Sequence, residues 1–388
     1  MSIALLVLGV LLACAAVHPF VTYPLSLTLF AHIRRRSQAG TGAHGFVPQR
    51  VALCVCFYNE ERVVRRKVEN MLAMRAAAPG LELLAYVDAA TDRTADILGE
   101  YADKLRLVVS PRRLGKTEGM NTLVGMTQAD IVVFSDANVM FASDAIPQLL
   151  STFAAPDVGC VCGHLVYGRG TDSPTAATGS LYWRLEEKIK ELESASGSVM
   201  GADGSIFAIR RALHVCPPSD LIDDMYVSLS VLGQGARIVR ADDALAFEET
   251  VSLPHEEFRR KIRIACQAFN VHRALHSQIA KLSLFDQYKY VSHKLLRWLT
   301  AYLLAGSFAC IMAGLLVDDA WQPAAALVSF TVLSSVLIWR TDRGRFGQIR
   351  AILAAFIATA IGVWFSVRGE RFQTWNSPQS ARDMVPGT

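Results

Sequence analysis

The sequence predicts an α/β domain with membrane helices attached at both of its ends. Of the 388 residues, 52% are hydrophobic and only 19% are charged, which is more apolar than an ordinary soluble protein. The apolar excess lies before residue 32 and beyond residue 297, while the stretch between about 45 and 285 has normal globular composition. In that stretch strand-like and helix-like segments alternate, which is typical of a parallel sheet covered by helices on both faces.

The first apolar segment predicts an N-terminal transmembrane anchor over residues 1–33. No Lys or Arg precedes its apolar run, so the basic start that is usual for a secretory signal is missing. The first charged residues are Arg34, Arg35 and Arg36. Because basic residues flank the cytoplasmic side of membrane spans, we expect the chain after them to lie in the cytoplasm.

The segment 45–283 is predicted to be one domain whose strands bring polar residues to one edge of a sheet. The expected strands and helices cover, in order, 50–58, 61–74, 81–88, 104–110, 116–126 and 130–136. Asn59 and Glu60 follow the first strand, and Asp88 and Asp136 end the second and the fourth. Ligands gather at the carboxyl ends of parallel strands, so these side chains predict a binding site there.

This predicted site lacks two common nucleotide-binding motifs. The first strand is followed by FYNEERV, not by the Gly-x-Gly-x-x-Gly of dinucleotide-binding folds, and RRLGKTEG (112–119) lacks the earlier glycine of a P-loop. A nucleotide would therefore be bound through acidic residues, a metal ion and Lys116. The formal net charge of +4 is too small to indicate a nucleic-acid partner.

The C-terminal part predicts further membrane helices over 298–367, followed by a tail, 368–388. Residues 284–297 mix Tyr, Lys and Arg with apolar residues, which favours an interfacial helix over an ordinary amphipathic surface helix. Basic residues in the loop 340–350 put that loop on the cytoplasmic side. Whether the marginal segment 351–367 crosses fully is left open, because crossing would carry the arginines of the tail to the outer side.

The eight cysteines predict no disulfide framework. Two Cys-x-Cys pairs, Cys54/Cys56 and Cys160/Cys162, lie in strand-like sequence, where alternate residues share one face. Buried thiols in a reducing compartment are favoured over a four-thiolate zinc site.

Seven short motifs follow one another through the middle domain. In order they are FYNEE (57–61), VDAATDRT (87–94), RRLGKTEGMN (112–121), SDAN (135–138), GADGSIFAIRR (201–211), LIDDMYVSLSVLGQGARIV (221–239) and RRKIRIACQ (259–267). Each motif is weak alone, but their order is similar to that of family 2 glycosyltransferases of the GT-A fold, specifically the membrane-anchored relatives of cellulose, chitin and hyaluronan synthases. The resemblance covers about residues 50–275.

This resemblance implies an inverting, metal-dependent transfer of a sugar from a nucleotide sugar, expected to be UDP-linked, to a glycan or lipid acceptor. By the same resemblance Asp224, the second Asp of IDDM, is the general base that takes the acceptor's proton. A divalent cation, Mg²⁺ or Mn²⁺, is held by Asp136 and Asn138 and offsets the charge of the leaving diphosphate. The implied nucleotide-sugar contacts are Asn59, Glu60, Asp88, Lys116, Asp136, Arg260 and Arg263, and the implied acceptor side includes Asp203 and Gly204.

The resemblance also implies where the protein acts. It suggests an integral protein of a bacterial inner membrane, with the catalytic domain in the cytoplasm and with membrane lipids, donor and acceptor as its partners. The process would be the synthesis of a cell-surface polysaccharide or glycolipid. The alternative function is a catalytically inactive GT-A scaffold or a binding subunit of a polysaccharide-synthesis complex.

Three positions need separate interpretation. Asn138 stands where the family has a second Asp; its amide oxygen can bind a hard cation but brings no charge, so the diphosphate would supply most of the negative ligands. Ile264 stands where the family has a Trp that stacks on an acceptor sugar, which favours transfer of one or a few sugars over long polymerisation. Asp before an apolar run commonly caps a helix, and this interpretation is favoured for Asp223 but not for Asp224.

Overall fold

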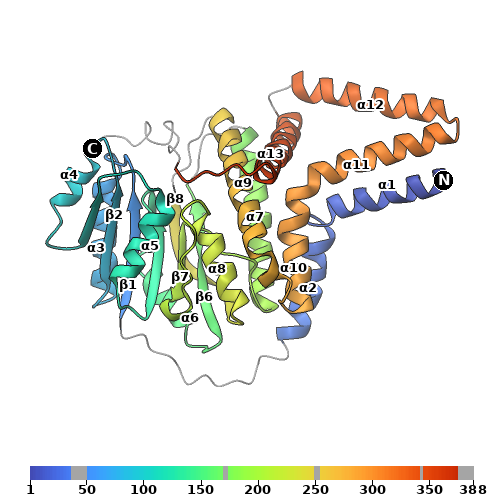
Figure 1. Cartoon of the computed structure of the whole chain (residues 1–388). Helices are drawn as coiled ribbons and strands as arrows, with labels where there is room; N and C mark the ends of the chain where they lie inside the picture. The colour runs from blue at the N-terminus through green and yellow to red at the C-terminus, as the bar shows by residue number, and fades with distance from the viewer. Residues whose placement is uncertain (36–49, 169–173, 249–253, 341–343, 375–388) are drawn as a thin grey trace.

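The computed structural model describes residues 1–35, 50–168, 174–248, 254–340 and 344–374. Figure 1 shows an α/β domain from which a group of long helices projects to one side. The α-helices are α1 (Ser2–Val17), α2 (Thr22–Arg35), α3 (Val64–Ala77), α4 (Thr94–Gly99), α5 (Lys116–Met126), α6 (Ala145–Thr152), α7 (Pro174–Ala195), α8 (Asp223–Gly233), α9 (Pro254–Ile279), α10 (Leu284–Tyr290), α11 (Leu296–Val317), α12 (Trp321–Arg340) and α13 (Gly344–Val367). A π-helical turn, Val291–Leu295, joins α10 to α11, and a 3₁₀ turn covers Arg211–Leu213.

In the described part of the chain, eight strands form one mixed sheet. They are β1 (Val51–Phe57), β2 (Glu82–Asp88), β3 (Arg106–Ser110), β4 (Ile131–Asp136), β5 (Val139–Phe141), β6 (Val158–Tyr167), β7 (Ile206–Arg210) and β8 (Arg237–Glu248), in the spatial order β3-β2-β1-β4-β7-β6-β8-β5. The first four run parallel, as predicted. The other half corrects the prediction of a parallel sheet, because β7 pairs antiparallel with β4 and β6, and β5 pairs antiparallel with β8.

Helices cover both faces of this sheet, as predicted, because the strands are apolar on both sides. Leu53 and Val55 of β1 point into one core, where they meet Met71 and other residues of α3, α4 and α6. Cys54 of the same strand points into the opposite core, which holds Leu123 and other residues of α5, α8 and α9. All eight cysteines are free in the structure.

The predicted elements of the parallel half are confirmed with small shifts at their ends. The four expected strands are β1 to β4, and the helix expected over 116–126 is α5. The helix expected over 61–74 begins later, at Val64, because the preceding residues form a turn in which the Val63 N–H donates to the Glu60 carbonyl at 3.0 Å. The expected domain start, 45–49, lies outside the described residues.

Among the described residues, three helices are long and apolar enough to cross a membrane: Leu284–Val317, Trp321–Arg340 and Phe346–Val367. The N-terminal segment that was expected to be one anchor is two helices, α1 and α2, which meet at an angle of 60°, and this bent pair would make a fourth span. Length and composition therefore agree with the predicted membrane helices at both ends of the chain.

Helices α1, α11 and α12 project together from the domain (Figure 1). α1 and α11 run antiparallel and pack through small residues. A Cβ atom added to Gly9 would lie 2.6 Å from the Ile311 side chain, and the Ser307 hydroxyl donates to the Gly9 carbonyl at 2.8 Å. Glycine is needed at such a helix contact because it lets the two backbones approach closely.

Helix α13 ends against α9, at the α/β domain. Gly362 lies so close to the backbone of Ile262 that a side chain would not fit there. The chain after α13 stays on α9, because Asn270 Nδ2 donates to the Glu370 carbonyl at 3.0 Å and Gln267 Nε2 donates to the Phe372 carbonyl at 2.7 Å. The end of the marginal segment 351–367 is therefore on the same side as the sheet.

A buried polar cluster joins the N-terminal helices, α7 and the start of α11. Both nitrogens of the His293 ring form hydrogen bonds, with Nδ1 2.7 Å from Glu193 Oε1 and Nε2 3.0 Å from Glu186 Oε1. The Tyr23 hydroxyl donates to Glu193 at 2.5 Å, and Arg297 pairs with Glu186. His293, Glu193 and Tyr23 are completely buried, so this cluster fixes α2 and the π-helical turn to α7 away from solvent.

Candidate active site

A lysine and three carboxylates meet at the carboxyl end of β4. Lys116, the first residue of α5, places its Nζ 2.8 Å from Asp136 Oδ1 and 3.4 Å from Asp223 Oδ2. The Cβ position of Gly204 lies 2.9 Å from Lys116 Nζ and 3.0 Å from Asp224 Oδ2, so Lys116 and Asp224 flank this glycine. The structure thus brings together five residues from four separate motifs, at the sheet edge where the sequence predicts a site.

The charge of Lys116 is stabilised by these carboxylates. Although burial disfavours the charged amine, Asp136, Asp223 and Asp224 raise the pKa of Lys116 above its ordinary value. The lysine is therefore a permanent positive charge at the end of β4, as binding of a diphosphate requires.

Asp224 is a carboxyl group in a site that disfavours its ionisation. Burial and the neighbouring Asp223 raise the pKa of Asp224 to about 7, against the effect of Lys116. A group with this pKa can accept a proton near neutral pH. The helix-cap interpretation of Asp223 is wrong, because the N-cap of α8 is Ile222, no side chain caps the helix, and the Asp223 carboxylate faces Lys116.

The predicted acceptor side lies next to Asp224. Asp203 is bound to Lys190 of α7, with Nζ and Oδ2 2.5 Å apart, and Lys190 also contacts Glu187 at 3.2 Å. A side chain at Gly204 would displace the charged ends of Lys116 and Asp224. A loop anchored to α7 therefore forms one wall of the site.

Asn138 and Glu248 form a contact beside Asp136 that the sequence did not reveal. Asn138 Nδ2 donates to Glu248 Oε1 at 3.0 Å, since β5 pairs with β8 in a register that sets Val139 opposite Glu248. Asp136, Asn138 and Glu248 offer oxygen atoms, which are the ligands that Mg²⁺ and Mn²⁺ prefer, so this donor set fits the cation implied by the resemblance. Across the described ranges, no three His, Cys, Asp or Glu side chains are grouped to hold a metal ion by themselves.

Two arginines of α9 face the same site. Burial and Arg260 lower the pKa of Arg263 to about 10, whereas Asp136 and Asp224 act in the opposite direction, so Arg263 is within electrostatic reach of both carboxylates. Arg263 also donates to Gln267 at 2.9 Å. Arg260 is paired with Glu257, with Nε 2.8 Å from Oε2.

Asp88 holds the turn that precedes Lys116. Its two carboxylate oxygens accept hydrogen bonds from the backbone N–H groups of Leu114 at 2.7 Å and Gly115 at 2.9 Å. Gln373, after α13, lies on the same turn and donates through Nε2 to the Leu114 carbonyl at 2.9 Å. In the structure Asp88 is thus a positioning residue for Lys116, and its contact with a nucleobase stays a prediction.

Asn59 and Glu60 link the loops after β1 and β2. The Asn59 amide oxygen accepts from the Thr91 N–H at 2.8 Å, and the Glu60 N–H donates to the Thr94 hydroxyl at 2.8 Å. Asn59 has a positive φ of 52°, a conformation that asparagine tolerates better than most residues. These residues shape the edge of the predicted nucleotide site.

Lys67 of α3 supports the Asp136–Asn138 turn from inside the protein. Its fully buried Nζ donates to the Ser135 hydroxyl at 2.7 Å and to the Val139 carbonyl at 2.5 Å. Burial lowers the pKa of Lys67 to about 7, against the effect of Asp136. Lys67 lies within the helix expected over 61–74, and no feature of the sequence around it predicts this role.

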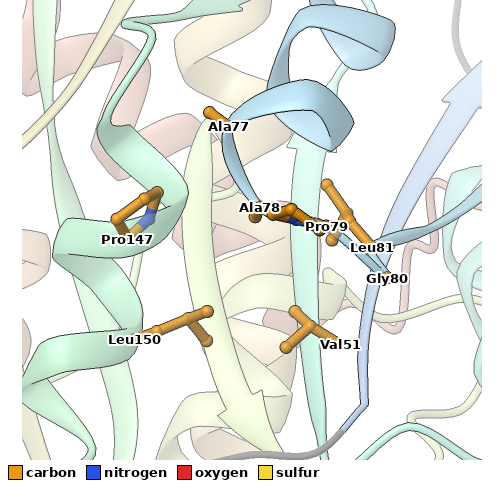
Figure 2. Close-up of a pocket in the computed structure, with 8 residues that line it drawn as sticks. All are labelled: Val51, Ala77, Ala78, Pro79, Gly80, Leu81, Pro147 and Leu150. Atoms are coloured by element: carbon orange, nitrogen blue, oxygen red, sulfur yellow. The ribbon is translucent and has the colours of Figure 1, made fainter.

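A separate cavity of about 260 Å³ lies at the opposite edge of the sheet (Figure 2). It is lined by Val51, Ala77, Ala78, Pro79, Gly80, Leu81, Pro147 and Leu150. These residues carry no titratable side chain, and Val51 and Leu81 lie at the amino ends of β1 and β2. The charged residues of the candidate site lie at the carboxyl ends of the strands, whereas this cavity lies at their amino ends.

Residues 52–216 match the protein family described as Glycosyl transferase family 2. The beta-monoglucosyldiacylglycerol synthase of Nostoc sp. (strain PCC 7120) is 29% identical over 116 residues, which are 29% of this chain and 25% of that relative. The N-acetylglucosaminyltransferase of Bradyrhizobium elkanii is 26% identical over 128 residues, 31% of this chain and 69% of that relative. The chain thus spans about a quarter of the length of the synthase that it matches.

The fold is shared with a mannosyltransferase from Pyrobaculum calidifontis solved in complex with GDP-Man and Mn²⁺. The two structures superpose with a TM-score of 0.70 at 20% sequence identity, covering 93% of this chain and 99% of the other. The two structures therefore share the mixed α/β architecture. Residues 52–216 therefore belong to a family 2 glycosyltransferase domain with the GT-A fold.

Proposed function

We propose that this protein transfers a sugar from a UDP-linked nucleotide sugar to a lipid or glycan acceptor at the membrane, with inversion at C1. The observation that carries the proposal is the meeting of Lys116, Asp136 and Asp224 at the carboxyl end of β4. A fixed positive charge, a cation ligand and a carboxyl group with a pKa of about 7 are the groups that this transfer needs.

In the proposed reaction the acceptor hydroxyl oxygen bonds to C1 of the donor sugar while the bond between C1 and the diphosphate oxygen breaks. The electron pair of the broken bond leaves with the nucleoside diphosphate, and Asp224 accepts the hydroxyl proton. Attack on the face opposite the leaving group inverts the configuration at C1.

The leaving diphosphate is the centre of charge in this reaction. Lys116 pairs with Asp136, and Arg263 interacts electrostatically with the same carboxylate, so both would bind the phosphates. Asp136 and Asn138 would hold the divalent cation, which when bound offsets the growing negative charge. The GDP-Man and Mn²⁺ bound to the Pyrobaculum mannosyltransferase support a nucleotide sugar and a cation.

The remaining predicted residues would bind the rest of the two substrates. The loops that would receive the nucleotide contain Asn59 and Glu60 and are held in part by Asp88. Arg260 would lie near the phosphates of the nucleotide. The wall that carries Asp203 and Gly204 would receive the acceptor. The Nostoc relative is named for a glycolipid product, and the membrane helices here adjoin the domain, so a lipid acceptor is supported.

The first test is release of nucleoside diphosphate by the purified full-length protein. UDP-glucose, UDP-GlcNAc and UDP-galactose would be offered with Mn²⁺, with and without diacylglycerol. At least one donor is expected to be consumed, and EDTA is expected to stop the release, because Lys116 and Arg263 alone leave the diphosphate charge partly uncompensated. The Lys116→Met variant is the control and should lose the activity.

The alternative, an inactive scaffold, predicts a different result in the same experiment. A scaffold would bind UDP but release none from any donor, whatever acceptor is added. Inactivity of the wild-type protein with all three donors, together with UDP binding, would favour that alternative.

We further propose that α1, α11 and α12 cross a bacterial inner membrane and that α13 lies at its cytoplasmic surface. Because residues 370–373 bind α9 and the turn at Leu114, the end of α13 must be on the side of the catalytic domain. α11 leaves from the side of the catalytic domain, so α12 returns to that side if both helices cross. The start of α13 is then on the same side as its end. The turn between α11 and α12 lies at the far end of the projecting helices (Figure 1).

Single cysteines test this topology in intact cells. A cysteine at position 319 is expected to react with a membrane-impermeant maleimide, whereas cysteines at 345 and 371 should react only after permeabilisation. The background would lack the native cysteines that are exposed or partly buried, namely Cys14, Cys56, Cys216 and Cys310. Labelling of position 371 before permeabilisation would contradict the proposed location of α13.

A further inference from the structure

We propose that Glu248 is the second carboxylate of the cation site and replaces the acidic residue that the family pattern has at position 138. The inference rests on the proposed function, because it concerns the cation that would accompany the nucleotide sugar. It assigns a role to the last described residue of β8, which lies 110 positions from Asn138 in the sequence.

The first argument is the position of Glu248. Asn138 follows the end of β4, and its Nδ2 donates to Glu248 Oε1 at 3.0 Å. The strand register that sets Val139 opposite Glu248 holds the two side chains together on neighbouring strands. Glu248 is therefore fixed beside Asp136 by the sheet, not by a chance contact of a loop.

The second argument is the orientation of the two groups. The hydrogen bond uses the amide nitrogen of Asn138 and one oxygen of Glu248. This bond does not involve the amide oxygen of Asn138 or the second oxygen of Glu248, which are the atoms that would bind a cation. With Asp136 these atoms form an oxygen donor set that carries two negative charges, which suits a divalent cation shared with phosphate oxygens.

The third argument is electrostatic. The carboxyl groups of Asp136 and Glu248 interact electrostatically with each other. Two interacting like charges repel each other, and a divalent cation bound between them would remove the repulsion.

These contacts also explain why residue 138 is an asparagine. An aspartate at this position would replace the donor Nδ2 with an oxygen facing Glu248 Oε1 across 3.0 Å. The asparagine instead donates a hydrogen bond that orients the carboxylate. In the sequence interpretation the diphosphate supplies most of the negative ligands; in the present proposal the protein adds a second carboxylate from β8.

The test measures binding of Mn²⁺ to the full-length, detergent-solubilised protein at a fixed UDP concentration, with electron paramagnetic resonance of free Mn²⁺ as the readout. Glu248→Gln is expected to raise the half-saturating Mn²⁺ concentration by about 10-fold or more, as removal of a metal-site carboxylate does. The double variant Asn138→Asp/Glu248→Gln exchanges the two groups: residue 138 now carries the carboxylate, and the amide at residue 248 can donate a hydrogen bond to it. It is expected to recover most of the lost affinity.

Asp243→Asn is the matched control, because it removes one carboxylate from an exposed position on the same strand. It should leave the Mn²⁺ affinity at the wild-type value. Wild-type affinity in Glu248→Gln would overturn the inference, and so would a double variant that binds as weakly as the single one, since damage to the fold is not repaired by the second substitution. If the wild-type protein shows no UDP-dependent Mn²⁺ binding, the proposed donor site itself is wrong.

Discussion

Replacement of Asp224 by Asn is expected to lower kcat by about 10²-fold or more while UDP binding stays near the wild-type value. The amide has the shape of the carboxyl group but cannot accept the acceptor's proton. It also leaves the ion pairs of Lys116 with Asp136 and Asp223 in place. Turnover of the donor that is found active, measured as diphosphate release with acceptor present, and UDP affinity, measured by titration calorimetry, would separate the two effects.

The pH profile tests the same assignment without removing the residue. Because Asp224 must be ionised to accept a proton, kcat/KM should be low in acid and rise as the pH passes through about 7, the pKa of this carboxyl group in its buried site. The negative charge of Asp223 contributes to that pKa. Asp223→Asn should therefore keep most of the turnover and shift the rise to lower pH.

Two outcomes would contradict this role for Asp224. One is near-wild-type turnover in Asp224→Asn. The other is an Asp223→Asn variant whose activity falls as far as that of Asp224→Asn with no shift of its pH profile, because Asp223 would then be the base.

The parallel half of the fold could be predicted from the sequence because its information is local. Each apolar run ends in or next to the polar residue that lies at the sheet edge, as the run 130–136 ends in Asp136. The family resemblance then placed Lys116, Asp136 and Asp224 in one site, and the structure brings them together. Local pattern and motif order were sufficient for these residues.

The rest depends on contacts between distant segments, which one sequence does not reveal. Glu248 reaches Asn138 only through the antiparallel pairing of β5 with β8, and β5 has three residues and no distinctive pattern. Asp223 looks like a helix cap in sequence, but in the fold it faces a lysine from another helix. The apolar composition of 351–367 fits a span, yet contacts with α9 decide where its end lies.

The cluster around His293 is the clearest case of such a distant contact, and it also determines how firmly the membrane helices are attached to the catalytic domain. The imidazole lies between Glu186 and Glu193, which are both buried. Although burial disfavours their ionisation, His293 lowers the pKa of both carboxyl groups, so each is held as a carboxylate. Glu186 keeps Arg297 as a second partner, whereas the Glu193 side chain otherwise has the Tyr23 hydroxyl and the Met200 N–H.

His293→Ala is accordingly expected to destabilise the protein by about 1–3 kcal/mol, because it leaves the buried Glu193 carboxylate without one of its hydrogen-bond partners. The midpoint of a denaturant titration in detergent, followed by tryptophan fluorescence, measures the loss. Adding Glu193→Gln to His293→Ala should restore part of it, since the glutamine can still accept from Tyr23 and carries no charge. His276→Ala, at an exposed position on α9, is the control and should change the midpoint little. If His293→Ala were as mild as His276→Ala, or if Glu193→Gln made it worse, the hydrogen bonds of His293 would not stabilise the cluster. Attachment of the membrane helices would then depend on the apolar contacts of Tyr23 and Leu27 with α7.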